Sequence, residues 1–241
     1  MSRSRGRLSY LRSLLITAPL IGIYTAIMGT ISVASSLVDS TGRMQHGCAR
    51  IWSRMILWTS GVRLMVKGLD NIKPGVPCVF CVNHQSHMDI PIVLVALPVQ
   101  FRFMAKKQLF GIPFLGWHLR RSGQVSIDRE NPRAALKSMR AASAQVQKGT
   151  PLVIFPEGGT SVDGVMHPFK GGGFVLATHS TIDVVPVTIR GSRQVLVPKT
   201  WHVKSGKVDV TIGPPISSRG LSANELAERT YETMLKTFRS G

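Results

Sequence analysis

The hydrophobic residues of this chain follow one pattern before about residue 70 and another after it. A run of 25 residues from Leu14 to Val38 contains no charged side chain, and a helix that crosses a bilayer needs about 20 apolar residues. The next segment, from His46 to Lys67, mixes apolar side chains with arginines, as an amphipathic helix at the level of lipid headgroups does. Together the two segments predict a helical hairpin in contact with a membrane.

The first apolar run is compatible with more than one arrangement. Pro19, Gly22 and Gly29 interrupt it and allow a bent helix that dips into one leaflet, as well as a helix that spans. A cleaved signal peptide is a weaker interpretation, because the run exceeds the usual apolar core of about 7–15 residues. For the second segment, the alternative is that it packs on the rest of the protein.

After residue 75 the pattern changes to short β-branched runs that alternate with helical segments. We expect strands at residues 76–82, 125–128, 152–155, 184–189 and 208–212. Asn131-Pro132 is typical of a helix start, and Ser222 with Glu225 is typical of a capping box. This alternation predicts an α/β sandwich. We therefore expect a membrane-anchoring hairpin at residues 1–70 and one αβ catalytic domain at residues 71–241.

The charge of the chain requires an anionic partner. Lys and Arg total 30 against 12 Asp and Glu, a formal net charge of +18, which attracts phospholipid headgroups, nucleic acid or an acidic carrier. Basic residues flank the apolar run on both sides, at Arg3, Arg5, Arg7, Arg12, Arg43, Arg50 and Arg54. That placement favours an anionic phospholipid surface. Nucleic acid is not expected, since no zinc-finger or RNP signature is present.

The three cysteines indicate core packing. Cys48, Cys78 and Cys81 are an odd number, too few for a disulfide framework, and they suit a reducing cytoplasm. Cys78 and Cys81 form a CxxC inside a predicted strand, where residues three apart point to opposite faces. We expect both to be buried core residues, with metal binding or a disulfide as the weaker interpretations.

A histidine and an aspartate leave the end of the first predicted strand together, in Asn83-His84-Gln-Ser-His-Met-Asp89. A turn between strand and helix lets Asp89 accept a hydrogen bond from the His84 imidazole, which prepares the other ring nitrogen to take a proton from a hydroxyl. Alone, the pair is equally compatible with a capping Asp89 and a surface His84. A metal site through His87 matches no zinc signature, and no metal is expected.

A second loop, Phe155-Pro-Glu-Gly-Gly-Thr-Ser161, follows another predicted strand. Its glycines allow backbone N–H groups to approach an anion or a glycerol headgroup, although an ordinary turn reads the same way. A third stretch, from Lys106 to Arg129, places cations around an apolar turn, as a phosphate-bearing amphiphile requires. A fourth, Val185-Pro-Val187, alone would suggest an edge strand.

In combination and order, these four blocks resemble the lysophosphatidic acid acyltransferases, the 1-acyl-sn-glycerol-3-phosphate acyltransferase family. The resemblance covers about residues 76–190 and implies a mixed sheet sandwiched by helices. It implies that His84 is the catalytic base for the sn-2 hydroxyl and that Asp89 orients it. The acyl donor would be acyl-CoA or acyl carrier protein thioester, with no further cofactor and phosphatidic acid as product.

The same resemblance assigns substrate-binding residues. It gives Glu157 and Gly158 to the headgroup-binding block and makes Lys106, Arg129 and Lys170 candidates for the substrate phosphate. The family block usually reads Glu-Gly-Thr-Arg-Ser, whereas this chain reads Glu-Gly-Gly-Thr-Ser and lacks the arginine. Either another cation replaces it, or the acceptor is another lyso-lipid, such as a lyso-ornithine lipid or a lysophospholipid with a larger headgroup.

Two other functions use the same residues. A membrane hydrolase would pair His84 and Asp89 with a serine nucleophile, but its Gly-x-Ser-x-Gly elbow is missing from the sequence. A non-catalytic lipid-binding relative would bind without turnover. The basic N-terminus and basic catalytic domain predict a bacterial-type inner membrane protein with its catalytic domain on the cytoplasmic face. Phe110, Ile112, Phe114, Leu115 and Trp117 are candidates to line an acyl-chain tunnel.

Overall fold

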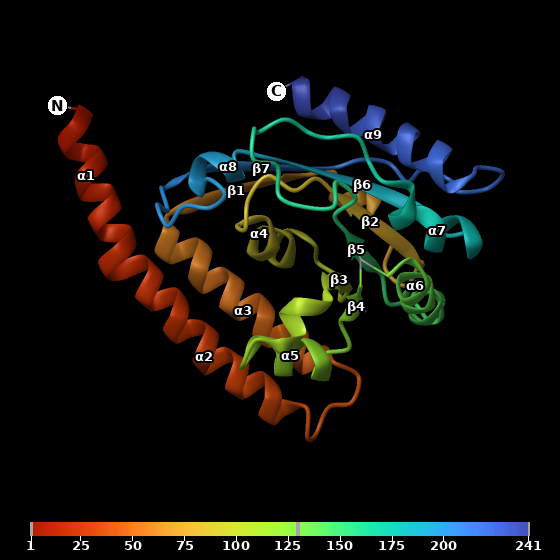
Figure 1. Ribbon diagram of the computed structural model, residues 1–241, viewed down its shortest axis with the longest axis horizontal. Coiled ribbons are helices and arrows are strands. Elements are labelled where there is room, and N and C mark those ends of the chain that lie inside the picture. The colour runs from red at the N-terminus through yellow and green to blue at the C-terminus, as the bar shows by residue number, and fades with distance from the viewer. Residues whose placement is uncertain (1, 129–130, 241) are drawn as a thin grey trace.

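The protein is built on one mixed β-sheet, shown in a computed structural model that describes residues 2–128 and 131–240 (Figure 1). The sheet has seven strands in the order β1-β7-β6-β2-β5-β3-β4. The strands are β1 (Val62–Lys67), β2 (Cys78–Val82), β3 (Arg102–Lys106), β4 (Val125–Ile127), β5 (Leu152–Ile154), β6 (Asp183–Arg190) and β7 (Gly206–Ile212). All neighbouring strands run parallel except β6 and β7, which confirms the mixed sheet.

Helices cover both faces of the sheet, because its central strands are apolar on both sides. The helices of eight or more residues are α1 (Ser2–Arg12), α2 (Ala18–Ser35), α3 (Arg43–Ser60), α4 (Asp89–Ala96), α6 (Pro132–Gln147) and α9 (Ala223–Arg239), and the shorter ones are α5 (Leu115–Arg121), α7 (Val175–His179) and α8 (Ser192–Val195). One core cluster joins the sheet to α3 and α4, and the other joins it to α6, α7 and α9. The α/β sandwich is confirmed.

The two cysteines of the CxxC show that side chains of β2 point alternately to the two faces of the sheet. Both are free and buried, but Cys78 belongs to the core on the α3 and α4 face, whereas Cys81 belongs to the core on the opposite face. Burial raises the pKa of the Cys78 thiol to about 12, so it carries no thiolate for metal or redox chemistry at neutral pH. The prediction of core cysteines is confirmed.

The N-terminal segment forms one long helix (Figure 1), and most side chains of residues 7–35 are exposed or half-buried. A π-helical stretch, Ser13–Thr17, joins α1 to α2 without a break. Within the described residues, Arg7–Ser35 is long and apolar enough to cross a membrane, and only 11% of its most apolar window is buried. This exposed apolar surface marks the chain as membrane-associated.

The second half of the predicted hairpin differs from the expectation. Helix α3 lies beside α2 and packs with Ile56 and Leu57 into the core against α4, so it lies on the sheet domain. It does not extend to Lys67, because Gly61 adopts a positive φ of 67° that ends the helix. Strand β1 follows and pairs with β7, so the segment before residue 70 contributes a strand to the same sheet as the rest of the chain.

The remaining local signals are confirmed, apart from the edge strand. The Asn131 side chain accepts a hydrogen bond from Ala134 N (3.1 Å), and the Ser222 capping box is complete in α9. Pro186, by contrast, lies in the interior strand β6, although the sequence alone suggested an edge. The proline is tolerated because it faces Gly213, one residue beyond the end of β7, where the ladder of hydrogen bonds is ending.

Candidate active site

The predicted catalytic residues gather at the carboxyl edge of the sheet. His84 follows β2 and Glu157 follows β5, and these two strands are parallel neighbours. Their carboxyl ends therefore open at the same edge, where ligand sites of α/β proteins are built. The Ser161 N–H donates to the His84 carbonyl over 2.8 Å, which holds the two loops together.

His84 and Asp89 form a hydrogen-bonded pair. Nδ1 of His84 lies 2.9 Å from Oδ2 of Asp89, with the His84 side chain 15% exposed and the Asp89 side chain fully buried. The same Oδ2 accepts the backbone N–H groups of Gln85 (2.7 Å) and Ser86 (2.8 Å). These donors and the start of α4 stabilise an ionised carboxylate. An ionised Asp89 only accepts, so Nδ1 carries the proton and Nε2 is left as the base.

Two neighbours fix the position of His84. The Asn83 side chain bonds both backbone groups of Ile189, donating to its oxygen (2.9 Å) and accepting from its nitrogen (2.7 Å), and so ties the end of β2 to β6. The ring of Phe155 stacks on the His84 imidazole with centroids 4.3 Å apart. The imidazole can therefore turn little, which keeps Nε2 directed at the site. Asn83 belongs to the sequence motif, but its structural role depends on the pairing of β6 with β2, which the motif does not show.

Glu157 lies behind the histidine and holds backbone groups. Its Oε1 accepts the His84 N–H over 2.6 Å and its Oε2 accepts the His167 N–H over 3.0 Å. The residue is only 8% exposed. Burial raises the pKa of this carboxyl, and the two backbone hydrogen bonds oppose that rise. The geometry gives Glu157 a positioning contact, while its contact with a headgroup stays a prediction.

A polar cavity of about 420 Å³ opens beside the pair and is lined by residues 157–163 together with His167 and Lys170. Gly158 has a positive φ of 85°, and a Cβ at this position would lie 3.0 Å from the Lys170 Nζ. A side chain here would displace the lysine, so the loop requires glycine. The predicted residues Glu157, Gly158 and Lys170 are thus brought together around one space that can hold an anion.

Thr160 stands next to the base, one residue before Ser161, where the family pattern has arginine. Its Oγ1 lies 3.2 Å from the His84 Nε2. With the proton on Nδ1, the Thr160 hydroxyl donates to Nε2 and occupies the direction from which an acceptor hydroxyl must approach. The sequence identified the missing arginine, but not the contact between its replacement and the base.

Lys106, another predicted cation, lies apart from this cavity. Lys106 is exposed at the carboxyl end of β3, on the same edge of the sheet but not among the residues that line the cavity. Arg129 lies outside the described residues. Arg193 was not predicted, yet its guanidinium donates to the carbonyls of Ser161 (3.0 Å) and Val162 (2.6 Å) and supports the loop. Arg193 lies shortly after β6, and no motif around it in the sequence indicates a contact with the loop at residues 161–162.

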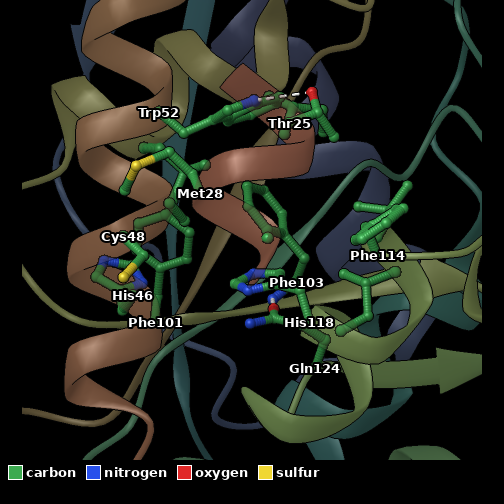
Figure 2. Close-up of a pocket in the computed structure, with 16 residues that line it drawn as sticks. Thr25, Met28, His46, Cys48, Trp52, Phe101, Phe103, Phe114, His118 and Gln124 are labelled. Carbon is green, nitrogen blue, oxygen red and sulfur yellow. Dashed lines mark hydrogen bonds between the residues drawn. The ribbon is translucent and has the colours of Figure 1, made fainter. Parts of the chain in front are cut away.

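An apolar cavity of about 110 Å³ lies between α2, α3, α4 and α5 (Figure 2). Ile90, directly after Asp89, is among its lining residues. Stacked rings connect the cavity to His84, since its lining residue Phe103 stacks on Phe155 and Phe155 stacks on His84. Of the five side chains predicted to line a tunnel, Phe114 and Leu115 line this cavity, whereas Phe110, Ile112 and Trp117 do not.

Two histidines, His46 and His118, also line the apolar cavity (Figure 2). Burial is the main cause that lowers the pKa of each to about 4, so both are neutral at physiological pH. The cavity can therefore accept a hydrocarbon chain without placing a charge beside it. Residues 2–128 and 131–240 contain no cluster of three or more His, Cys, Asp or Glu that could hold a metal ion.

A mixed sheet with helices on both faces and a His–Asp pair at its carboxyl edge agrees with the family comparison. The model of the Acyltransferase family matches residues 63–190, more than half of the chain, and the chain belongs to that family. The names of similar proteins are more specific than the name of the family. The 1-acyl-sn-glycerol-3-phosphate acyltransferase of Saccharomyces cerevisiae is 31% identical over 96% of this chain and 78% of its own length. The family predicted from the motifs is confirmed.

Other relatives agree in name but differ in length. The 1-acyl-sn-glycerol-3-phosphate acyltransferase of Pseudomonas aeruginosa is 32% identical over 73% of this chain and 70% of its own length. The chain spans little more than half of the chloroplastic relative from Brassica napus, at 31% identity and 56% coverage of that protein. The crystal structure of the acyltransferase PlsC from Thermotoga maritima matches with a TM-score of 0.80 at 25% identity, covering 98% of this chain and 96% of that one.

Proposed function

We propose that this protein transfers a fatty acyl group from a thioester to the sn-2 hydroxyl of 1-acyl-sn-glycerol-3-phosphate, which yields phosphatidic acid for phospholipid biosynthesis. The observation that carries the proposal is the His84–Asp89 pair, 2.9 Å apart, whose Nε2 contacts Thr160 in the lining of the polar cavity. The relatives bearing this reaction in their names cover most of the chain.

The reaction proceeds as a direct transfer. His84 Nε2 removes the proton from the acceptor hydroxyl while the hydroxyl oxygen attacks the thioester carbonyl carbon. Asp89 stabilises the imidazolium that forms. The tetrahedral intermediate then expels the thiolate as its C–S bond breaks, and the imidazolium returns the proton to sulfur. Holding both substrates beside one base supplies much of the rate acceleration.

The two cavities divide the substrates between them. The acyl chain of the thioester enters the apolar cavity behind Ile90, and the phosphate of the acceptor enters the polar cavity beside Lys170. Thr160 cannot make the bidentate contact that an arginine makes with phosphate. Lys170 is therefore the cation of this cavity that would hold the acceptor phosphate, with Glu157 and Gly158 shaping the loop around it. Lys106 and Arg129 stay candidates from the family resemblance alone.

The replacement of the family arginine by Thr160 suggests a second class of acceptor. Without the arginine, selectivity for a phosphate monoester is weaker, which favours another lyso-lipid, such as a lyso-ornithine lipid or a lysophospholipid with a larger headgroup. A lipid-binding relative without turnover is the non-enzymatic alternative. The donor is an acyl-CoA or an acyl carrier protein thioester, either of which the basic surface would attract.

We propose that the protein lies on a bacterial-type inner membrane, with α2 in the bilayer, the arginine-rich α1 at the level of the headgroups and the sheet domain on the cytoplasmic face. Exposed apolar side chains follow the outer side of these helices, including Leu15, Ile23 and Ile27, each more than half exposed. The arginines before residue 13 and the net charge of +18 suit an anionic inner leaflet. A helix that enters one leaflet keeps both ends on this side.

The test is consumption of oleoyl-CoA and of the matching carrier-protein thioester by the purified full chain in detergent. Lysophosphatidic acid is compared with other lyso-lipids, and His84→Ala is compared with wild type after its folding has been verified by circular dichroism. We expect phosphatidic acid as the main product and no transfer by His84→Ala. Transfer only to another lyso-lipid would mean that this lipid, and not lysophosphatidic acid, is the acceptor. No transfer to any acceptor would favour lipid binding without catalysis.

A further inference from the structure

A strongly basic pocket lies far from the catalytic pair. It has a volume of about 250 Å³, and its charged lining residues are Arg102, Arg120, Arg121 and Lys148. All of its lining residues are described, and none is an Asp or Glu. Four cations without a carboxylate repel one another unless an anion joins them. The composition of the pocket therefore favours a multiply charged anion.

Arg102 is the centre of this pocket, and it is buried. Only 7% of the residue is exposed, and its guanidinium donates to two neutral carbonyls, those of Thr41 (2.7 Å) and Phe101 (3.2 Å). No carboxylate of the described residues forms a salt bridge with it. Asp39 acts on it only from a distance, since the Asp39 oxygens accept from Thr41 and Met44. A buried guanidinium of this kind is costly without an ionic partner.

Two glycines leave the space that the guanidinium fills. Both adopt a positive φ, 74° at Gly42 and 72° at Gly123. A Cβ at Gly42 would lie 2.5 Å from Arg102 NH2, and one at Gly123 would lie 3.3 Å from its Nε. The loop before α3 and the turn after α5 thus hold the Arg102 side chain between them. The Arg102 guanidinium is therefore held in a fixed position, and the exposed Arg120, Arg121 and Lys148 line the pocket around it.

The basic pocket is separate from the active site. Arg102 begins β3, and Lys106 ends it at the carboxyl edge, where His84 lies. Four residues of extended strand separate these two positions by about 13 Å. Thr150 also lines the pocket and lies just before the amino end of β5, whereas Glu157 lies just after the carboxyl end of the same strand. The pocket therefore opens at the amino edge of the sheet, and a headgroup bound there cannot reach the base.

The pocket adjoins two strongly exposed apolar residues. Leu37 and Val38, each 81% exposed, form the turn after α2, and Ser40, Thr41 and Gly42 of the pocket follow after one intervening residue, Asp39. In Figure 1 this turn is the tip at which α2 and α3 meet, with α5 beside it. If Leu37 and Val38 enter the bilayer, the basic pocket lies at the level of the lipid phosphates.

We propose that this pocket is an accessory site for the phosphate monoester headgroup of a membrane lipid, held by Arg102, Arg121 and Lys148 and distinct from the acceptor site. A monoester presents up to two negative charges and three oxygens, which matches a guanidinium fork surrounded by further cations. A lipid bound there fixes the tip of the helical pair at the membrane interface. The site does not require the transfer reaction, so its test is independent of catalysis.

The test measures binding of the full chain to vesicles of phosphatidylcholine alone, and with about one-tenth phosphatidic acid or about one-tenth phosphatidylglycerol. We expect phosphatidic acid to strengthen binding about tenfold. The double variant Arg121→Glu/Lys148→Glu should lose this gain and keep its binding to phosphatidylcholine. The matched control Arg219→Glu/Arg229→Glu changes the charge equally at exposed residues outside the pocket and should keep the gain. All proteins carry His84→Ala as well, which separates the result from turnover.

Hydrogen exchange locates the bound headgroup. We expect phosphatidic acid vesicles to slow amide exchange around residues 40–43 and 120–124 beyond the effect of phosphatidylcholine. Protection confined to residues 156–170 would overturn the proposal in favour of the active site. An equal loss of affinity in both double variants, or an equal gain from phosphatidylglycerol, would replace it by general attraction to anionic surfaces. Protection by soluble glycerol 3-phosphate without a vesicle effect would leave a phosphate site but remove the lipid as its ligand.

Discussion

At the scale of single residues, one carboxylate oxygen organises the centre that we propose to be catalytic. Oδ2 of Asp89 accepts three N–H groups, from His84 Nδ1, Gln85 N and Ser86 N. The sequence already contained this contact, because five residues of separation across a turn bring an Asp back to a His. The spacing does not show that Asp89 is buried, and this burial strengthens its hydrogen bond to His84.

The variant Asp89→Asn tests this role. An amide accepts weakly at Nδ1 and its own N–H groups favour the wrong tautomer of His84, so we expect kcat/KM for thioester transfer to fall by about 10³–10⁴. The loss should appear in kcat, since neither substrate touches Asp89. The exposed Asp70→Asn serves as the control and should retain full activity. An Asp89→Asn enzyme as active as that control would exclude the pair as the catalytic centre.

The variant Thr160→Val separates direct transfer from a covalent route. Val keeps the shape of Thr but removes the hydroxyl that lies 3.2 Å from Nε2. In direct transfer this hydroxyl must turn aside for the acceptor, so we expect kcat to stay within about threefold of wild type. A loss as large as that of His84→Ala, together with an acyl group on Thr160 in the mass of the intact protein, would instead identify a threonine nucleophile.

At the scale of elements, the signals that were read correctly are local. The α9 capping box, the Asn131 cap and the strands β2, β5 and β6 depend on neighbouring residues. Strands β1 and β3 were missed, because Arg63, Lys67, Arg102 and Lys106 give them the appearance of basic surface segments. Their charged residues are accommodated at the outer half of the sheet and at strand ends, which only the strand order reveals.

Helix α9 offers a measurable local contribution. Ser222 Oγ accepts the Glu225 N–H (3.3 Å), and Glu225 Oε2 accepts the Ser222 N–H (2.8 Å). We expect Ser222→Ala to lower the free energy of unfolding by about 1 kcal/mol, because the first turn loses one hydrogen-bond acceptor. Denaturant unfolding measures the change, with the exposed Ser205→Ala as the control. An unchanged midpoint would mean that the box contributes nothing to the fold.

At the scale of the whole molecule, the apolar cavity exists only because distant segments meet. Helices α2 and α3 form one wall and α5 the other, with the sheet below (Figure 2). The substitution Ala49→Phe fills this cavity from α3. We expect kcat/KM for oleoyl-CoA to fall by roughly tenfold or more relative to decanoyl-CoA, because the longer chain loses its space. The control Ile51→Phe, which lies on the exposed side of the same helix, should leave the preference unchanged.

The two cavity histidines make the fold sensitive to acid. The pKa of His46 and of His118 is about 4 in the folded protein, below the ordinary 6.5, so the unfolded chain binds more protons. Stability is therefore complete above pH 6.5 and decreases as pH falls toward 4, by about 2 kcal/mol for each histidine between pH 7 and 5. Denaturant unfolding across this range should show the loss, and His46→Leu should reduce it. A flat profile would contradict the burial of the pair.

The sequence by itself determined the family, the α/β class, the His84–Asp89 pair and the loop that contains Glu157 and Gly158, because each depends on residues close together in the chain. The tertiary structure decided what the distant residues do. Glu157 holds backbone groups of two loops, Arg193 supports its loop, and Arg102 is the centre of a basic pocket at the opposite edge of the sheet. The physical reason is that hydrogen bonds, burial and charge balance between segments depend on the strand order, and no local pattern encodes that order.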